Sequence, residues 1–284
     1  MRTLKTTLLL TALTLLLLFL GQSFGGRNGM TFALVIAIVM NGTAYFFSDK
    51  IALRSAGAQP ISREQAPRLY AVMERLAAKA NVPMPKLYLI PQPAPNAFAT
   101  GRNPSHASVA VTQGLMELMD DEELEGVIAH EVSHVRNYDI LTSSIAATVA
   151  GAITWLASMG RWAMIFGGIG GRDNEGEGGG LAAILMLILA PVAALLLQLG
   201  ISRQREYQAD RSGAKMVGHP YGLMRALEKL GAYNKKIPMN ISPSTSALCI
   251  VAPLSARQIF AGLFSTHPAL SDRIARLRSM SVTR

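Results

Sequence analysis

The sequence predicts a mainly α-helical membrane protein, with four hydrophobic helices and a cytoplasmic α+β domain that carries a small β-sheet. Three observations predict this fold class. Half of the 284 residues are hydrophobic and only 16% are charged, whereas about a quarter of the residues in an ordinary soluble domain are charged. Four long windows contain no Asp, Glu, Lys or Arg. The remaining segments show the helix and strand patterns of a folded domain.

Composition also excludes several classes of protein. The single cysteine, Cys249, excludes a disulfide scaffold and a cysteine-based metal cage, since either needs several thiols. A chain this apolar is not intrinsically disordered. Its net charge of +9 is more typical of a membrane-orientation signal than of a nucleic-acid footprint, so we expect no nucleic-acid partner.

The charge-free windows are long enough to cross a lipid bilayer, because about 20 helical residues span a hydrocarbon core of about 30 Å. They are Thr6–Gly26, Asn28–Ser48, Ile140–Gly160 and Gly178–Ser202. The first can also be interpreted as a cleaved signal peptide. It is long for that purpose and a second window follows, so we favour an uncleaved hairpin. The third is rich in small residues, which suit a spanning helix and equally a helix buried in protein. Both alternatives remain open.

The basic residues predict the orientation. All but three of the 27 Lys and Arg residues lie in the N-terminus and in segments 49–139 and 203–284; the exceptions are Arg27, Arg161 and Arg172. By the positive-inside rule, both termini and the soluble part face the cytoplasm. We therefore expect an N-terminal transmembrane hairpin (1–48), a second hydrophobic hairpin (140–202), and one soluble domain formed by residues 49–139 and 203–284.

Local patterns predict the elements of the soluble domain. Leu69, Val72 and Leu76 have helical spacing. The acidic run 120–123 is typical of a helix N-terminus, where carboxylates bind free N–H groups. A turn-rich stretch at 101–105 separates two short β-like runs. The expected helices are Ser62–Asn81, Asp120–Asn137, Arg203–Val217, Tyr221–Gly231 and Pro268–Arg278; the expected strands are Lys86–Ile90 and a hairpin of Ala97–Thr100 with Ala107–Thr112.

The sharpest chemical signal is the sequence His130-Glu131-Val132-Ser133-His134. Positions i and i+4 share one face of a helix, so both imidazoles can reach a single metal ion. Glu131 can then lie beside a metal-bound water and accept its proton. The alternative is a pair of incidental surface histidines.

A second predicted helix offers the missing ligand. A catalytic zinc has three protein ligands and one open position. The other histidines are only His106, His219 and His267, so a carboxylate is the natural third ligand. Glu206 can bind the metal while Asp210, four residues on, accepts the outer N–H of a ligand histidine. The alternative is a solvated helix face with a salt-bridge cluster. Both helices adjoin hydrophobic windows, which places the site just under the membrane.

These motifs resemble those of the HtpX-type membrane zinc metallopeptidases of the gluzincin group. The resemblance covers essentially the full length. It implies a gluzincin-like peptidase domain with one zinc ion (Zn²⁺) per subunit, bound by His130, His134 and Glu206, and with Glu131 catalytic. It also implies an ATP-independent endopeptidase of the bacterial inner membrane that degrades misfolded or damaged membrane proteins. The residues that carry it are Asn96-Ala-Phe-Ala-Thr-Gly101, Ala129-His-Glu-Val-Ser-His134, Arg205-Glu-Tyr-Gln-Ala-Asp210 and Thr266-His-Pro268.

Two further assignments complete the predicted site. Asn96, Ala97, Phe98 and Ala99 are expected to form an edge strand that binds an extended substrate, since pairing through the backbone works for any sequence. The alternative is a plain hairpin strand. His267, at a helix start, can donate to the oxyanion of the tetrahedral intermediate, or occupy the open metal position as the resemblance suggests. The alternative is a capping or surface histidine.

Other functions remain open. A CAAX-type prenyl protease shares the zinc motif, but those proteins resemble a larger bundle with more spans. A non-catalytic membrane scaffold or holdase would hold a structural zinc, and the open fourth position argues against it. A transporter is disfavoured because the spans contain no ionisable residue that faces a possible pathway.

Overall fold

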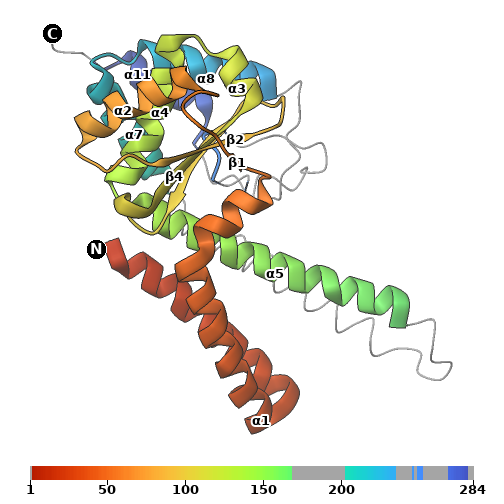
Figure 1. The fold of residues 1–284 in the computed structure, drawn as a ribbon. Helices are drawn as coiled ribbons and strands as arrows, with labels where there is room; N and C mark the ends of the chain where they lie inside the picture. The colour runs from red at the N-terminus through yellow and green to blue at the C-terminus, as the bar shows by residue number, and fades with distance from the viewer. Residues whose placement is uncertain (1, 168–201, 235–244, 246–247, 252–267, 281–284) are drawn as a thin grey trace.

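The computed structural model describes residues 2–167, 202–234, 245, 248–251 and 268–280. A helical hairpin projects from a domain in which helices surround a small sheet (Figure 1). The fourth hydrophobic window, apart from Ser202, and the candidate His267 lie outside the described residues.

The N-terminal hairpin is formed by α1 (Arg2–Ser55), which folds back on itself at Gly26 (Figure 1). Gly26 has a φ of 56°, a conformation that glycine adopts without steric cost. Its two arms, Thr6–Ser23 and Gly25–Ser55, are each long and apolar enough to cross a membrane. The predicted hairpin is present, and its second arm continues beyond the expected boundary at residue 48.

The surface of this hairpin is apolar. Large hydrophobic side chains are exposed along both arms, which is unfavourable in water and expected of a surface in contact with lipid. They include Leu8, Leu15, Phe19, Phe32, Val35, Ile38, Val39, Phe46 and Phe47. The chain is therefore a membrane protein with two apolar N-terminal helices.

The third hydrophobic window forms part of α5 (Asp139–Gly167), which packs against α1. Ile145 and Val149 are buried in one cluster with Leu9 and Leu13 of the first arm. This part of α5 is covered by protein, as the small residues of the window allow. Whether α5 also crosses the bilayer stays a prediction, and so does the total of four hydrophobic spans.

The sheet has four strands in the order β1-β2-β4-β3. β2 and β4 are parallel, whereas β1 is antiparallel to β2 and β3 is antiparallel to β4. The predicted strand and hairpin are confirmed, and β3 lies at an edge of the sheet. The two-residue β1 was not predicted, because so short a segment shows no alternation. The bounds are β1 Gln59–Pro60, β2 Lys86–Ile90, β3 Ala97–Gly101 and β4 Ala107–Thr112.

The helices follow the predicted order with small differences at their ends. The first begins at Pro67 rather than Ser62, because proline is well suited to the first helical turn, where its missing N–H costs nothing. The short α3 and the 3₁₀ turn η1 were not predicted. The bounds are α2 Pro67–Ala80, η1 Pro104–His106, α3 Gln113–Leu118, α4 Asp121–Arg136, α7 Arg203–Val217, α8 Tyr221–Asn234 and α11 Leu270–Arg278.

One hydrophobic core joins the two halves of the domain. Leu76, Val109 and Ile128 from the first half are buried in the same cluster as Leu227 and Leu277 from the second. The helices α7, α8 and α11 therefore complete the core that α2, α4 and the sheet begin. The two segments on either side of the hydrophobic insertion, residues 139–202, thus fold as one domain.

The N-terminus of α4 is held by a capping box. The Asp120 carboxylate accepts from the Glu123 N–H at 2.8 Å, and the Glu123 carboxylate accepts from the Asp120 N–H at 2.9 Å. These bonds satisfy backbone donors that a helix start leaves free. Lys229 of α8 also donates to Glu123, at 2.6 Å. The start of the helix that carries both histidines is thus anchored to a neighbouring helix.

Close contact between α4 and α8 requires a glycine at position 126. A Cβ atom there would lie 2.4 Å from the backbone nitrogen of Leu223. We predict that Gly126→Ala forces the helices apart and destabilises the domain by about 1–3 kcal/mol, as overpacking usually does. The thermal unfolding midpoint of the purified full chain in detergent measures this. Gly42→Ala is the control, because a Cβ there meets nothing within 4 Å; equal midpoints for the two variants would contradict the prediction.

Candidate metal centre

The three predicted metal ligands come together from two helices. His130 and His134 lie on α4, and Glu206 lies in the first turn of α7. One ligand atom from each lies within 4.8 Å of the other two. The two Nε2 atoms are 3.2 Å apart. The Glu206 carboxylate lies 3.5 Å from Nε2 of His134 and 3.6 Å from Nε2 of His130.

These separations fit a bound metal ion. Zinc binds imidazole nitrogen at about 2.0–2.1 Å in tetrahedral geometry, so two such ligands lie roughly 3.3 Å apart. The observed distances are close to that value, and two imidazoles with one carboxylate form a donor set of catalytic metal sites. The cluster therefore fits a metal site without rearrangement of the backbone.

Close packing of α7 on α4 brings the carboxylate to the histidines. A Cβ at Gly213 of α7 would lie 3.0 Å from the backbone nitrogen of His130, so a larger residue would push the helices apart. His130 and Glu206 are buried as a result, with 1% and 5% of their surface exposed. The site lies inside the domain. Its residues are therefore neither incidental surface histidines nor part of a solvated helix face.

The electrostatics of the site favour a cation. Burial acts to lower the pKa of His130, but hydrogen bonds that its ring donates to the Asp210 and Glu206 carboxylates outweigh burial and raise that pKa to about 9. The same negative field that holds a proton on the imidazole stabilises a metal cation between the ligands.

Asp210 contacts the outer nitrogen of His130, as its spacing predicts. Its carboxylate lies 2.9 Å from Nδ1 of His130. Burial would raise the pKa of Asp210, but Arg273 outweighs this and lowers it to about 2. A permanently charged acceptor keeps the proton of His130 on Nδ1 and leaves Nε2 free for a metal.

Arg273 of α11 is a site residue that sequence reasoning missed. Its guanidinium donates to both oxygens of Asp210, at 2.8 and 2.6 Å, and to the Ile250 carbonyl at 2.8 Å. It is completely buried. The sequence does contain a signal: Arg273 is spaced three residues after Leu270 and four before Leu277, so it lies on the apolar face of its helix. A charge in that position requires a buried partner.

Asp139 is the second missed residue. Its carboxylate lies 3.3 Å from Nδ1 of His134, and Arg205 lies 3.4 Å from its other oxygen. Each histidine of the cluster thus has its own carboxylate at the outer nitrogen, a common means of orienting ligand imidazoles. The sequence signal for this role was the position of Asp139, an acidic residue directly before the charge-free window Ile140–Gly160.

Glu131 lies buried beside the cluster, with 2% of its surface exposed. Burial is the largest influence on its carboxyl and raises the pKa, while His130, His134 and a hydrogen bond from the Ala99 backbone act in the opposite direction. A carboxylate with a raised pKa, close to two candidate ligands and to the edge strand, is suited to proton transfer.

The structure shows which parts of the predicted edge strand are already occupied. The Ala97 carbonyl accepts from the Ile250 N–H at 2.9 Å. The Asn96 side chain donates to the Val251 carbonyl at 2.8 Å. Phe98 is fully buried in a hydrophobic cluster. The Ala99 N–H donates to the Glu131 carboxyl, so a substrate that pairs at Ala99 would take the place of Glu131 at this donor. Ala99 is the remaining candidate for the predicted substrate contact. A role for His267 stays a prediction.

This geometry fits a membrane metalloprotease, and the family to which the chain belongs places it in that class. A buried carboxylate adjoins a His–His–Glu cluster, and the domain that holds both is attached to an apolar helical hairpin. The chain belongs to peptidase family M48, whose profile matches residues 62–281.

Relatives and a solved structure agree with this assignment. The chain is 56% identical to a "Protease HtpX homolog" of Desulfatibacillum aliphaticivorans, over 96% of this chain and 88% of the relative. A homologue of the same name from Aquifex aeolicus (strain VF5) is 52% identical over 92% and 87%. The predicted resemblance to the HtpX-type family is confirmed.

The crystal structure of S. mikatae Ste24p has a similar fold, with a TM-score of 0.53 and 21% identity. The similarity covers 97% of this chain and 64% of that one, so this chain spans less than two thirds of its length.

Loss of the Asp210 charge should weaken metal binding. We predict that Asp210→Asn lowers metal affinity by about 10–100-fold, because His130 loses a charged partner that holds its ring and raises its basicity. Competition with a fluorescent chelator measures the affinity. Asp272→Asn, an exposed neighbour of Arg273, is the control and should bind as the unmodified chain does. Unchanged affinity in Asp210→Asn would refute this role for Asp210.

Proposed function

We propose that this protein is a zinc-dependent endopeptidase of the bacterial inner membrane that hydrolyses misfolded or damaged membrane proteins. One zinc ion per subunit is held by His130, His134 and Glu206. The catalytic domain and both chain termini face the cytoplasm. Family membership, the shape of the donor set and the two apolar helices support this proposal.

The observation that carries the proposal is the position of Glu131. This carboxyl is buried between the histidine pair and the Ala99 backbone, and the three-residue donor cluster does not include it. A structural metal site does not need a further carboxyl group that is buried beside the ligands without being one of them, because removing that group from water costs free energy. That arrangement suits a general base and favours catalysis over the scaffold or holdase alternative.

The roles of the residues follow from their chemistry. Bound zinc supplies a Lewis acid that polarises a carbonyl and lowers the pKa of water. Glu131 accepts the proton of the attacking water and then passes it to the leaving amine. Asp210 and Asp139 keep the two imidazoles in place through their outer nitrogens. His267 is proposed to donate to the developing oxyanion.

An extended substrate is proposed to pair with the outer edge of β3 at Ala99, where a substrate carbonyl would replace Glu131 as the acceptor of the Ala99 N–H. The backbone groups of successive residues along a strand face opposite edges. Asn96, just before β3, bonds to Thr112 on the side of β4, so Ala99, three residues later, directs its backbone groups away from β4. Backbone pairing gives affinity for an unfolded segment whatever its sequence. The broad range of substrates expected of a quality-control protease suits this mode of binding.

The membrane arrangement supports substrates embedded in or near the bilayer. α5 begins at Asp139, three residues after the end of α4, and so starts next to the cluster. The Thr100 hydroxyl on β3 lies 2.7 Å from the Ser144 hydroxyl on α5. Edge strand, cluster and hydrophobic helix are thus adjacent, and a polypeptide leaving the bilayer meets the active site directly.

Replacement of Glu131 separates catalysis from metal binding. We predict that Glu131→Gln retains stoichiometric zinc but lowers casein cleavage by about 10²–10⁴-fold, the usual contribution of a general base. Metal analysis of the purified full chain and a cleavage assay, each with and without a chelator, give the two readouts.

Glu125→Gln on the same helix is the matched control, since Glu125 pairs with Arg75 at 3.5 Å away from the cluster. It should retain both zinc and activity. A Glu131→Gln enzyme that cleaves at the normal rate would exclude the proposed mechanism. An unmodified chain that binds zinc but never cleaves would favour the scaffold or holdase.

A further inference from the structure

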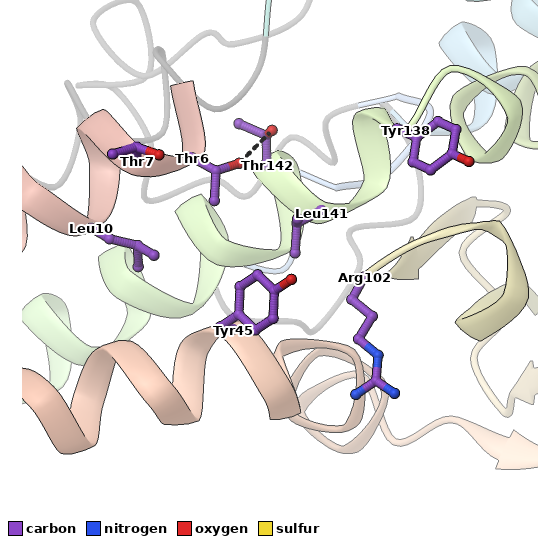
Figure 2. Close-up of a pocket in the computed structure, with 8 residues that line it drawn as sticks. All are labelled: Thr6, Thr7, Leu10, Tyr45, Arg102, Tyr138, Leu141 and Thr142. Carbon is purple, nitrogen blue, oxygen red and sulfur yellow. Dashed lines mark hydrogen bonds between the residues drawn. The ribbon is translucent and has the colours of Figure 1, made fainter. Parts of the chain in front are cut away.

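A cavity of about 460 Å³ lies where the N-terminal hairpin, α5 and the soluble domain meet. Its volume is within the range of about 300–1,000 Å³ typical of ligand pockets. Figure 2 shows residues from three parts of the chain around it: Leu10 and Tyr45 from the two arms of α1, Leu141 from α5, and Arg102 from the turn after β3. None of these residues belongs to the metal cluster.

The cavity lies at the ends of the hydrophobic segments nearest the soluble domain. Thr6 begins the first apolar span, and Tyr45 lies near the end of the second charge-free window. Thr142, near the start of the third window, is joined to Thr6 through their hydroxyls, 3.1 Å apart. All three window ends that meet here are on the side of the soluble domain. With the N-terminal hairpin across the bilayer, as proposed above, the cavity lies at the headgroup level of the leaflet next to the soluble domain.

The lining changes from apolar to cationic across the cavity. Leu10 and Leu141 line the part between the hydrophobic helices, whereas Arg102 belongs to the soluble domain. Tyr45 and Tyr138 are partly exposed, with 38% and 46% of their residue surface accessible. Tyrosines are enriched where the hydrocarbon meets the headgroups, because one end of the ring is apolar and the other polar.

Among the residues that the structure describes, Arg102 has no partner of opposite charge at this boundary. Its guanidinium lies 2.9 Å from Nε2 of His106, which accepts a hydrogen bond but supplies no negative charge. Within the described part of the chain, no carboxylate forms an ion pair with Arg102. A guanidinium in this position is suited to bind a phosphate through two parallel hydrogen bonds.

We propose that this cavity binds one anionic phospholipid from the leaflet next to the soluble domain. The phosphate lies against Arg102 and the acyl chain lies between Leu10 and Leu141. Basic pockets between membrane helices are a known type of headgroup site. The apolar walls favour a lipid over a free phosphate ion, because a small anion would leave them in contact with water. The proposal depends on the membrane position of α1 and not on catalysis.

The test uses the full chain in phosphatidylcholine nanodiscs that contain a trace of phosphatidylglycerol with a photoreactive acyl chain. We expect crosslinks on the peptides that contain Leu10 and Leu141. Arg102→Gln should lower this labelling by about fivefold or more, since a single basic residue contributes that much near a membrane. Leu141→Trp, which fills the apolar part, should abolish it.

Two controls separate the site from general effects. Arg54→Gln removes an exposed charge from the last turn of α1, outside the cavity, and should leave labelling unchanged. Thermal unfolding midpoints establish that each variant remains folded, and casein cleavage is followed in parallel. Normal labelling with no cleavage would refute the proposed function and support the lipid site.

Four outcomes would overturn the proposal. Equal labelling by photoreactive phosphatidylcholine would show that the headgroup charge is not recognised. Loss of labelling in millimolar inorganic phosphate would identify a free-anion site. Displacement by an unlabelled single-span peptide would assign the cavity to polypeptide. Equal labelling of the unmodified chain, Arg102→Gln and Leu141→Trp would exclude the cavity as the site.

Discussion

The arrangement of the metal centre depends on one buried ion pair, between Arg273 and Asp210. Both charges are removed from water, so each is tolerated only because the other is present with good hydrogen-bond geometry. The pair joins α11 to α7, and Asp210 extends the contact to His130 on α4. Three helices that are far apart in the sequence are therefore held in one arrangement, and that arrangement directs His130 toward Glu206. Loss of either partner would leave an uncompensated charge in the core, which is a much larger penalty than loss of a surface salt bridge.

The beginning of α5, which opens the hydrophobic insertion between the two ligand-bearing helices, is a structural part of the candidate metal centre. Residues 139–202 separate the histidine helix from the carboxylate helix, yet both helices are buried in the same core. Asp139, at the first position of α5, holds His134, and Ser144 one turn further contacts β3. Any movement of α5 relative to the domain would therefore reach both a candidate ligand and the edge strand. This coupling gives a physical reason for a membrane protease to place the helix that carries its histidine pair directly before a hydrophobic helix.

The short segment 248–251 limits the part of the β3 edge that is open to the proposed pairing with a substrate. Ile250 pairs with the Ala97 carbonyl, and Val251 accepts from Asn96. The Ile250 carbonyl in turn accepts from Arg273. The same segment thus contacts the edge strand on one side and the ion pair on the other. A peptide that pairs with β3 is restricted to the region of Ala99, next to Glu131, so the structure that orients the metal ligands also sets where an extended chain can bind.

The sequence by itself determined the features that depend on local spacing. Two histidines four residues apart share a helix face, an acidic run caps that helix, and charge-free windows define the hairpin. The strands Lys86–Ile90 and Ala107–Thr112 and the helix Arg203–Val217 were predicted with their observed bounds. Only the tertiary structure decided which helix faces meet. Arg273, Asp139 and Ile250 contribute through contacts with residues distant along the chain, and periodicity shows which face of a helix is buried but not what it is buried against. The charge of Arg273 on an apolar helix face indicated that a buried partner exists. Only the tertiary structure shows that this partner is Asp210.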